Sequence, residues 1–388
     1  MKTKIREEIK NIKDEIYAIR RHFHRYPELS FKEFNTAETI SQHLDKFGIV
    51  HKKGVGKTGI VGEINFGPGP IIALRADMDA LPIQEENNLD YKSLNDGVMH
   101  ACGHDGHMAI LLGAANALSK NSKLKKGTVR FIFQPAEEGL GGAKYMIEDG
   151  CLDKVDEIYG LHLWNYQLYG EVGIKDGPVM ASADLFDIEV SGKGGHGATP
   201  QGTVDAIVVA SNLVTMLQTI VSRNTNPLES TVLSIGKIKG GHNFNIISDK
   251  VHMSGTTRAY TEENRTMIKQ RMKEVIEGVS KSFGADIKLN YKDGYPPTVN
   301  HSSQVEKVLE AARSIVASGA KNPYLSMGGE DFSYYLQNKP GCFFFVGSAP
   351  NKNEILSTPH HCSHLNIDER ALLVGASVYL NLIENSFS

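Results

Sequence analysis

Apolar residues at the start of the chain recur at helical spacing. They are separated alternately by four and three positions, which places them on one face of a long helix over about residues 5–23. A shorter amphipathic helix follows and is expected to end at Gly48, because glycine readily takes the left-handed conformation that terminates a helix. The apolar face of the first helix consists of Ile5, Ile9, Ile12, Ile16, Ile19 and Phe23.

From residue 59 to about residue 163, short apolar runs alternate with helical patterns. Continuous apolar runs are typical of strands that are covered on both faces. Their alternation with helices indicates an α/β layered structure with a largely parallel sheet. The expected strands are 59–64, 71–76, 128–134 and 157–163, and the expected helices are 108–120 and 141–150.

The pattern changes near residue 183. Apolar and polar residues alternate in "DLFDIEVSG", which suits a sheet with one face exposed to solvent. The elements that follow complete the order β-α-β-β-α-β, the split βαβ arrangement of ferredoxin-like domains. We therefore interpret 183–294 as an inserted domain. Its later elements are a helix over about 203–222, strands 231–240 and 250–260, a helix carrying 267–283, and strand 286–291.

After residue 294 the chain returns to its first pattern, with a helix, strand 342–348 and a final helix from about residue 368. A length of 388 residues also favours two domains. The sequence thus predicts an α/β/α domain with a mixed, largely parallel sheet, formed by 1–182 and 295–388. An α+β domain, 183–294, is inserted in it.

Composition and charge exclude several classes of function. A net charge of -3 lacks the basic excess of nucleic-acid-binding proteins. No uninterrupted apolar run reaches about 18 residues, so a membrane span is not expected. The charged N-terminus lacks the apolar core of a signal peptide, which predicts a cytoplasmic location. The cysteines are too sparse for a disulfide scaffold and leave thiolates free for metal binding or catalysis. They are Cys102, Cys151, Cys342 and Cys362.

Potential metal ligands are concentrated in "MHACGHDGH". Cys102 and His104 stand just before an expected helix, and thiolate and imidazole are ligands of zinc-like divalent ions. A lone buried cysteine or histidine is commonly structural, but the whole cluster favours a metal site. His100 and His107 are assigned supporting roles. Asp105 could orient a ligating imidazole through the second ring nitrogen of that imidazole.

A second cluster, "FQPAEEG", follows an apolar strand. Ligand sites of parallel α/β sheets lie beyond the carboxyl ends of the strands. Of the adjacent carboxylates Glu137 and Glu138, one could coordinate a metal while the other moves protons. Other clusters allow two interpretations. His162 is a core histidine or a ligand, His196 lies in a flexible hairpin tip or against a ligand, and the histidines of "PHHCSHLNIDE" belong to a site or to a solvated loop.

Ordered motifs along nearly the whole chain resemble the amidohydrolase branch of the zinc aminoacylase/carboxypeptidase superfamily, and among its members the hippurate hydrolases and N-acyl-L-amino acid amidohydrolases most. The motifs are "RRHFHRYPELSFKEFNTA", "LRADMDALPIQE", "MHACGHDGHMAILLGAA", "FQPAEEGLGGAKYMIEDG", "SGKGGHGATP", "FNIISD", "GTTRAY" and "MGGEDFSYY".

The resemblance implies roles for particular residues. The general acid/base falls on Glu137, and Asp77 and Asp79 support the metal ligands. His361 is chosen from its loop by its spacing to "NIDE", although this loop lacks the proline and the aromatic residue usual in the family. Ser248 stands where proline is common. Residues that would contact substrate are His196, Asn245 and Arg258. The ligands of a dinuclear metal site, bridged by Cys102, would be Cys102, His104, Glu138, His162 and His361.

The implied activity is metal-dependent cleavage of the amide bond of N-acyl-L-amino acids. Two divalent ions per subunit, Zn²⁺ or Mn²⁺ with Ni²⁺ or Co²⁺ as alternatives, would lower the pKa of a water molecule toward neutrality. Glu137 would move its proton, and Arg258 would bind the substrate carboxylate through two parallel hydrogen bonds. The inserted domain would act as a lid and form a homodimer, in which His196 could reach the partner's site.

Three alternatives remain open at this stage. The first is a metallo-carboxypeptidase or dipeptidase of the same superfamily. The second is a hydrolase with Cys102 as nucleophile and a histidine base. The third is a metal-storage module, which would leave Glu137 without a role. The acyl group is also open among acetyl, benzoyl and indolyl-acetyl.

Overall fold

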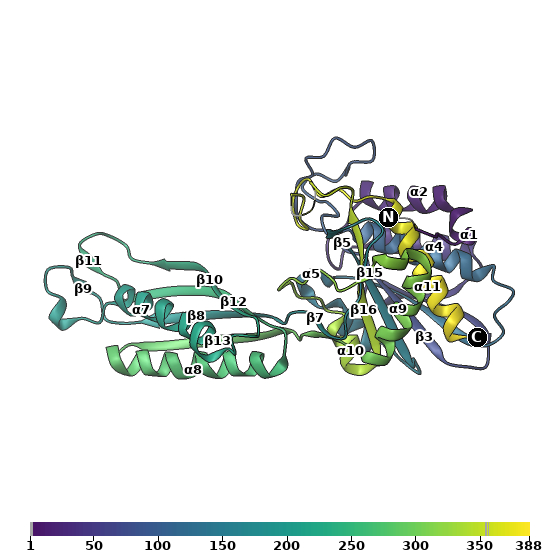
Figure 1. Cartoon of the computed structure of the whole chain (residues 1–388). Helices are drawn as coiled ribbons and strands as arrows, with labels where there is room; N and C mark the ends of the chain where they lie inside the picture. Colours follow the sequence, from purple (N-terminus) through teal and green to yellow (C-terminus); the bar gives the residue numbers. More distant parts are fainter. Residues whose placement is uncertain (1–2, 354, 356) are drawn as a thin grey trace. The chain divides into compact units, whose positions relative to one another are not determined.

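The computed structural model describes residues 3–353, 355 and 357–388, which fold into two compact units (Figure 1). The first unit holds the chain up to Val179 together with Val299–Tyr324 and Asp331–Ser388. The second unit holds Met180–Thr298 and Leu325–Glu330. The inserted segment of the sequence analysis, 183–294, falls inside the second unit.

The first unit is built on one large sheet. Its strands are β1 (Val50–Val55), β2 (Gly59–Gly67), β3 (Ile71–Asp77), β4 (Gly127–Gln134), β5 (Glu157–Leu168), β6 (Val172–Gly173), β15 (Ala320–Lys321) and β16 (Gly341–Ala349). They lie in the order β1-β2-β4-β3-β5-β16-β6-β15. The central strands β4, β3, β5 and β16 are parallel, β2 and β6 pair with them antiparallel, β1 is antiparallel to β2, and β15 is parallel to β6. The predicted mixed, largely parallel sheet is confirmed.

Helices cover both faces of this sheet. Phe343 and Phe344 are neighbours in β16, so their side chains point to opposite faces. Phe344 meets Tyr379 of the last helix, with ring centroids 5.8 Å apart, whereas Phe343 meets Phe332 at 5.1 Å. The helices of the unit are α1 (Glu7–Lys10), α2 (Lys13–Arg25), α3 (Phe34–Lys46), α4 (His104–Ser119), α5 (Glu137–Leu140), α6 (Gly142–Glu148), α9 (Ser302–Val316), α10 (Ser333–Asn338) and α11 (Arg370–Ser386).

The structure corrects two boundaries in this unit. The single first helix is in fact two, α1 and α2, because the amide of Ile12 bonds to the carbonyl of Ile9, three residues back, at 3.2 Å. The helix expected from residue 108 begins at His104. Gly103, with φ 89°, turns the chain directly into α4, a conformation that favours glycine.

The second unit has the predicted order β-α-β-β-α-β. Its antiparallel sheet runs β10-β12-β8-β13, and Phe186, Ile188 and Val190 of β8 are buried in its apolar core. Two short strands form a separate pair, β9 with β11. The bounds are β8 (Ala183–Ser191), β9 (Gly195–His196), α7 (Ala206–Thr219), β10 (Thr231–Gly240), β11 (Ile246–Ile247), β12 (Lys250–Ala259), α8 (Glu262–Phe283) and β13 (Asp286–Tyr295). A further pair links β7 (Gly177–Met180) with β14 (Thr298–Asn300).

One helical stretch of the described chain, Ala206–Asn224, has the length and apolar composition of a membrane span, with a hydropathy of 1.4. It comprises α7 and the π-helical turn that continues it. One face of α7, with Val209 and Leu213, is buried in the core of the second unit. A helix packed in this way meets the same criteria, so composition and length do not by themselves indicate a span.

Candidate metal centre

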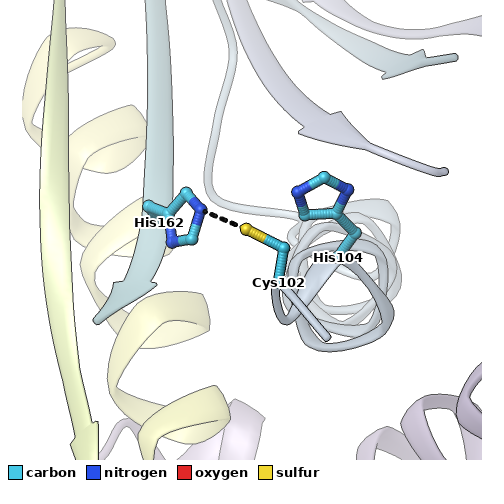
Figure 2. A group of neighbouring side chains, drawn as sticks. All are labelled: Cys102, His104 and His162. Atoms are coloured by element: carbon cyan, nitrogen blue, oxygen red, sulfur yellow. Dashed lines mark hydrogen bonds between the residues drawn. The ribbon is translucent and has the colours of Figure 1, made fainter. Parts of the chain in front are cut away.

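Cys102, His104 and His162 bring their ligand atoms together in the first unit (Figure 2). Cys102 lies two residues before the start of α4, His104 begins that helix, and His162 lies within β5. The sulfur of Cys102 is 3.4 Å from Nε2 of His162, and the ligand atoms of all three residues lie within 4.8 Å of one another. All three side chains are buried. Because β5 continues to Leu168, His162 lies inside the strand rather than at its end.

Hydrogen bonds leave the ε nitrogens of the two histidines facing this group. Nδ1 of His162 bonds to the carbonyl oxygen of Leu163 at 2.6 Å, and Nδ1 of His104 bonds to that of Asp79 at 2.8 Å. Since carbonyls only accept hydrogen bonds, each Nδ1 carries the proton. Nε2 of His104 is buried without a hydrogen-bond partner among the described residues. Both rings therefore present a lone pair where a metal ligand needs one.

A second group, formed by Cys102, Glu138 and His361, shares the same sulfur. Oε1 of Glu138 lies 3.2 Å from Nε2 of His361, and it is buried without a hydrogen bond of normal geometry within the described part of the chain. His361 has a φ of 67°, a left-handed conformation that is costly for residues other than glycine and is often found at functional sites. Two donor sets of thiolate, imidazole and carboxylate that share Cys102 would suit two divalent ions.

The neighbouring histidines have other partners. His107 donates from Nδ1 to Asp77 at 2.6 Å, and its Nε2 accepts the amide hydrogen of Leu163 at 2.8 Å. Both of its ring nitrogens are therefore used. Asp77 is fully buried, which would raise its pKa, but electrostatic interactions with His104 and Arg75 hold that pKa well below its usual range.

The structure distinguishes the three histidines of the C-terminal loop. His360 stacks on Trp164 with ring centroids 5.0 Å apart, and its Nε2 accepts the amide hydrogen of Asn165 at 3.2 Å. Burial lowers the pKa of His360 to about 3. His364 is exposed and lies 3.4 Å from Glu86. Of the three, His361 is the one that the structure brings to Glu138 and Cys102.

We expect Cys102→Ser and His361→Ala to lower the metal content of the purified protein, whereas His360→Ala and His364→Ala change it less. Each of the first two variants removes a donor atom, and the other two remove a stacked ring and an exposed ring. Elemental analysis after dialysis against metal-free buffer measures the metal-to-protein ratio of the four variants. Loss of metal from His364→Ala together with full retention in His361→Ala would show that the loop histidine is wrongly assigned.

Asp79 ties the metal ligands to Glu137. Its Oδ1 accepts the amide hydrogen of Glu137 at 3.0 Å, its Oδ2 accepts that of Glu138 at 3.0 Å, and its carbonyl accepts from His104. Glu137 is buried, and its carboxylate lies within 4.8 Å of the ligand atoms of His104 and Glu138. One aspartate thus positions two donors and the expected proton carrier.

We expected that Asp105 could orient a ligating imidazole, but in the structure it has other partners. It lies on the side of α4 that faces α2, where its Oδ2 accepts hydrogen bonds from Arg20 at 2.9 Å and from His24 at 2.8 Å. The second nitrogen of His24 lies 3.1 Å from Glu85. The sequence carried a signal for this buried network, because Arg20 and His24 share the helical face of the apolar residues of α2.

In the second unit, the three residues expected to contact substrate do not lie together. His196 and Asn245 are exposed and neighbour each other: Ile246, next to Asn245, pairs with His196, and the carbonyl of Asn245 accepts the amide hydrogen of Gly197 at 2.8 Å. Arg258 stands eight residues beyond Lys250 in β12. Lys250 is paired with Ser191, at the end of β8 from which the chain continues to His196. At roughly 3.3 Å per residue, this separation along β12 is about 26 Å.

Arg258 is half-buried, and its side chain forms no ion pair or hydrogen bond with the described residues. In the same unit, Arg265 donates to both oxygens of Asp184, at 2.9 and 2.7 Å. Burial lowers the pKa of Arg258, and the more distant Asp184 offsets this in part. A guanidinium that is partly removed from water without a carboxylate beside it is suited to binding an anion from outside.

Comparison with known proteins gives concordant matches. Residues 73–385 match the model of peptidase family M20/M25/M40. The YhaA protein of Bacillus subtilis (strain 168) is 43% identical over 385 residues, which cover 97% of this chain and 96% of YhaA. N-acetyl-L-cysteine deacetylase of the same strain is 43% identical over 373 residues, covering 96% of this chain and 88% of the deacetylase. Thermostable carboxypeptidase 1 of Saccharolobus solfataricus is 42% identical over 378 residues, covering 96% of this chain and 95% of the carboxypeptidase.

Among solved structures, the YXEP protein of Bacillus subtilis, described as a dinuclear metal binding peptidase from the M20 family, superposes with a TM-score of 0.83. It is 35% identical in sequence, and the match covers 97% of this chain and 99% of that one.

Proposed function

This chain belongs to peptidase family M20/M25/M40 and to its amidohydrolase branch, and from that premise we propose that it hydrolyses N-acyl-L-amino acids to a carboxylic acid and a free amino acid. It is a metal-dependent hydrolase of amide bonds. The observation that carries the requirement for a free carboxylate is Arg258, a half-buried arginine without a carboxylate partner among the described residues. A substrate with a free carboxylate next to the amide would supply that partner. The acyl group is proposed from the similarity to amidohydrolases.

The side chains of the first unit divide the chemistry between them. Bound at Cys102, His104, Glu138, His162 and His361, two divalent ions would act as Lewis acids and make water nucleophilic at neutral pH. Glu137 takes up the proton of the attacking water and delivers it to the leaving amine. Two hydrogen bonds from the backbone amides of Glu137 and Glu138 to Asp79 fix the positions of both residues for these proton transfers. The soft thiolate of Cys102 favours Zn²⁺, and Mn²⁺, Ni²⁺ or Co²⁺ are alternatives.

A lid-mediated homodimer is part of the proposal. The outer face of α7 exposes Ile207, Val208 and Met216 to between 44% and 47%, which leaves apolar surface there for a partner. His196 is also exposed, at the opposite end of the unit from Arg258. We infer that α7 meets its counterpart in a second copy and that His196 serves the site of that copy. Light scattering of the purified protein tests the dimer, and an enzyme that is fully active as a monomer contradicts it. We also place the enzyme in the cytoplasm, without nucleic-acid or membrane partners.

Carboxypeptidase action is the second candidate function, because a carboxypeptidase is among the similar proteins. Both kinds of substrate carry a free carboxylate, so Arg258 is compatible with either. They differ in the group on the other side of the scissile bond, an acyl group in one case and a peptide in the other. A thiol mechanism is a further rival, since Cys102 lies 3.4 Å from His162.

An assay of N-acyl amino acids on metal-stripped protein separates these alternatives. We expect release of free amino acid from acetyl, benzoyl or indolyl-acetyl derivatives once Zn²⁺, Mn²⁺, Ni²⁺ or Co²⁺ is added, and loss of activity with chelator. The metal-free protein is expected to be inactive because its own groups do not activate water at neutral pH. Dipeptides with free amino termini serve as the comparison. Faster cleavage of the dipeptides would favour the peptidase, and full activity with chelator would favour the thiol mechanism.

A further inference from the structure

Three consecutive backbone amides before and within α5 are held by two buried carboxylates. Asp79 accepts the amide hydrogens of Glu137 and Glu138, and Glu33 accepts that of Ala136 at 2.9 Å. Glu33 lies 103 residues earlier in the chain, just before α3. The turn at Ala136 is therefore also held by a residue, Glu33, that does not belong to the motifs assigned to the metal site.

Ala136 adopts a conformation that alanine avoids. Its φ and ψ are 54° and 45°, in the left-handed region, where the side chain crowds the backbone. The carbonyl of Ala136 also has a partner, because it accepts the amide hydrogen of Gly142 at 3.0 Å. A strained residue persists where its surroundings hold it in place, and here the partner of its amide is Glu33.

Glu33 is itself held firmly. Its side chain is 0% exposed, and its second oxygen accepts a hydrogen bond from the hydroxyl of Thr58 at 2.7 Å. Its carbonyl accepts the amide hydrogen of Ala37 in the first turn of α3, at 3.0 Å. Burial, together with the nearby charge of Asp79, raises the pKa of Glu33 to about 7, although the hydrogen bond from Thr58 works in the opposite direction. A buried carboxyl group is therefore kept here although its desolvation works against folding.

We propose that Glu33 is a positioning residue that holds Ala136 in its left-handed conformation and thereby directs the carboxylate of Glu137 toward the reacting groups. This rests on the proposed role of Glu137 as the proton carrier. Glu33 touches neither substrate nor metal in this account, and it acts through one hydrogen bond to the residue before Glu137. Both Glu137 and Glu138 keep their tethers to Asp79, but Glu137 directly follows Ala136, so we expect loss of Glu33 to affect the proton carrier more than the metal ligand.

The test compares substitutions at Glu33 with a matched control at Thr58. Glu33→Met fills the same volume without a strong acceptor, and Glu33→Asp keeps the charge but withdraws it by one methylene group. Glu33→Gln retains an oxygen that can accept from Ala136. Thr58→Val removes the other hydrogen bond to the same carboxylate and leaves the bond to Ala136 intact. Each variant is assayed on the amide substrate that the wild type cleaves best, with its metal content and melting temperature measured in parallel.

We expect Glu33→Met and Glu33→Asp to lower kcat by about 10- to 100-fold, as a small misplacement of a catalytic group does, with KM and metal content within about threefold. Glu33→Gln is expected to retain most of kcat, and Thr58→Val to melt at a lower temperature with kcat unchanged. The proposal is wrong if a folded Glu33→Met or Glu33→Asp variant keeps the wild-type kcat. It is also wrong if Glu33→Gln loses as much of kcat as those two variants do.

Hydrogen exchange at the amide of Ala136 tests the tether without any substrate. Exchange is expected to be slow in the wild type, Glu33→Gln and Thr58→Val, and at least about tenfold faster in Glu33→Met and Glu33→Asp, because the amide loses its acceptor. Equal exchange in all five proteins overturns the proposal. A wild type that cleaves no N-acyl amino acid would overturn the proposed function instead and leaves this measurement valid.

Discussion

Glu137→Gln is expected to keep its full metal content and to lose about 10²- to 10⁴-fold in kcat, the usual contribution of a positioned acid–base group. The amide side chain has nearly the same shape, so the tether of its backbone to Asp79 is preserved. It cannot take up and release a proton at neutral pH. The five proposed ligands are unchanged, and metal affinity should therefore stay near that of the wild type.

The neighbouring carboxylate provides the control for this result. Glu138→Gln replaces a proposed ligand and is expected to lower metal content first, with part of its activity returning when metal is added in excess. Steady-state kinetics and elemental analysis of both variants distinguish the two roles. A metal-replete Glu137→Gln enzyme with near-normal kcat would show that another group carries the proton.

Arg258→Ala is expected to cost about 10- to 150-fold in kcat/KM, which corresponds to the roughly 1.5–3 kcal/mol of a hydrogen bond to a charged group. Arg258→Lys should recover only part of this, because an ammonium group cannot form the planar pair of hydrogen bonds. The structural reason is the contrast with Arg265, which has Asp184 as its partner in the same unit.

The decisive comparison uses an N-acyl amino acid and the corresponding C-terminal amide. The wild type should prefer the acid strongly, and Arg258→Ala should lose that preference. Arg223→Ala is the matched control, since Arg223 is an exposed arginine of the same unit. This variant should prefer the acid over the amide as strongly as the wild type does. If the wild type cleaves the amide at the same rate as the acid, Arg258 does not bind a substrate carboxylate and the substrate class must be widened.

Periodicity along the chain predicted the fold well. The alternating residues of β8 and the continuous apolar runs of β4 and β16 report directly how many faces of each strand are covered. The break between α1 and α2 was missed, because a shift from four-residue to three-residue hydrogen bonds leaves the apolar spacing intact.

The candidate site was only partly readable from the sequence. Clusters around Cys102 and Glu137 stood out because ligand types are dense in them. The partners in contacts between distant residues were not readable in this way. The face of α2 marks Arg20 as buried but does not identify Asp105, 85 residues away, and Glu33 reaches Ala136 across 103 residues. That Arg258 has no carboxylate partner within the described chain is likewise visible only in three dimensions.

The shared sulfur of Cys102 also bears on how the protein folds. Its two donor sets join residues from Cys102 to His361, so the centre closes a loop of about 260 residues that contains the whole second unit. Closing so long a loop costs conformational entropy, and neither donor set exists in an unfolded chain. Free metal should therefore act as a late cross-link: it stabilises the finished fold by mass action and raises its melting temperature with metal concentration, while the early part of the chain folds without it.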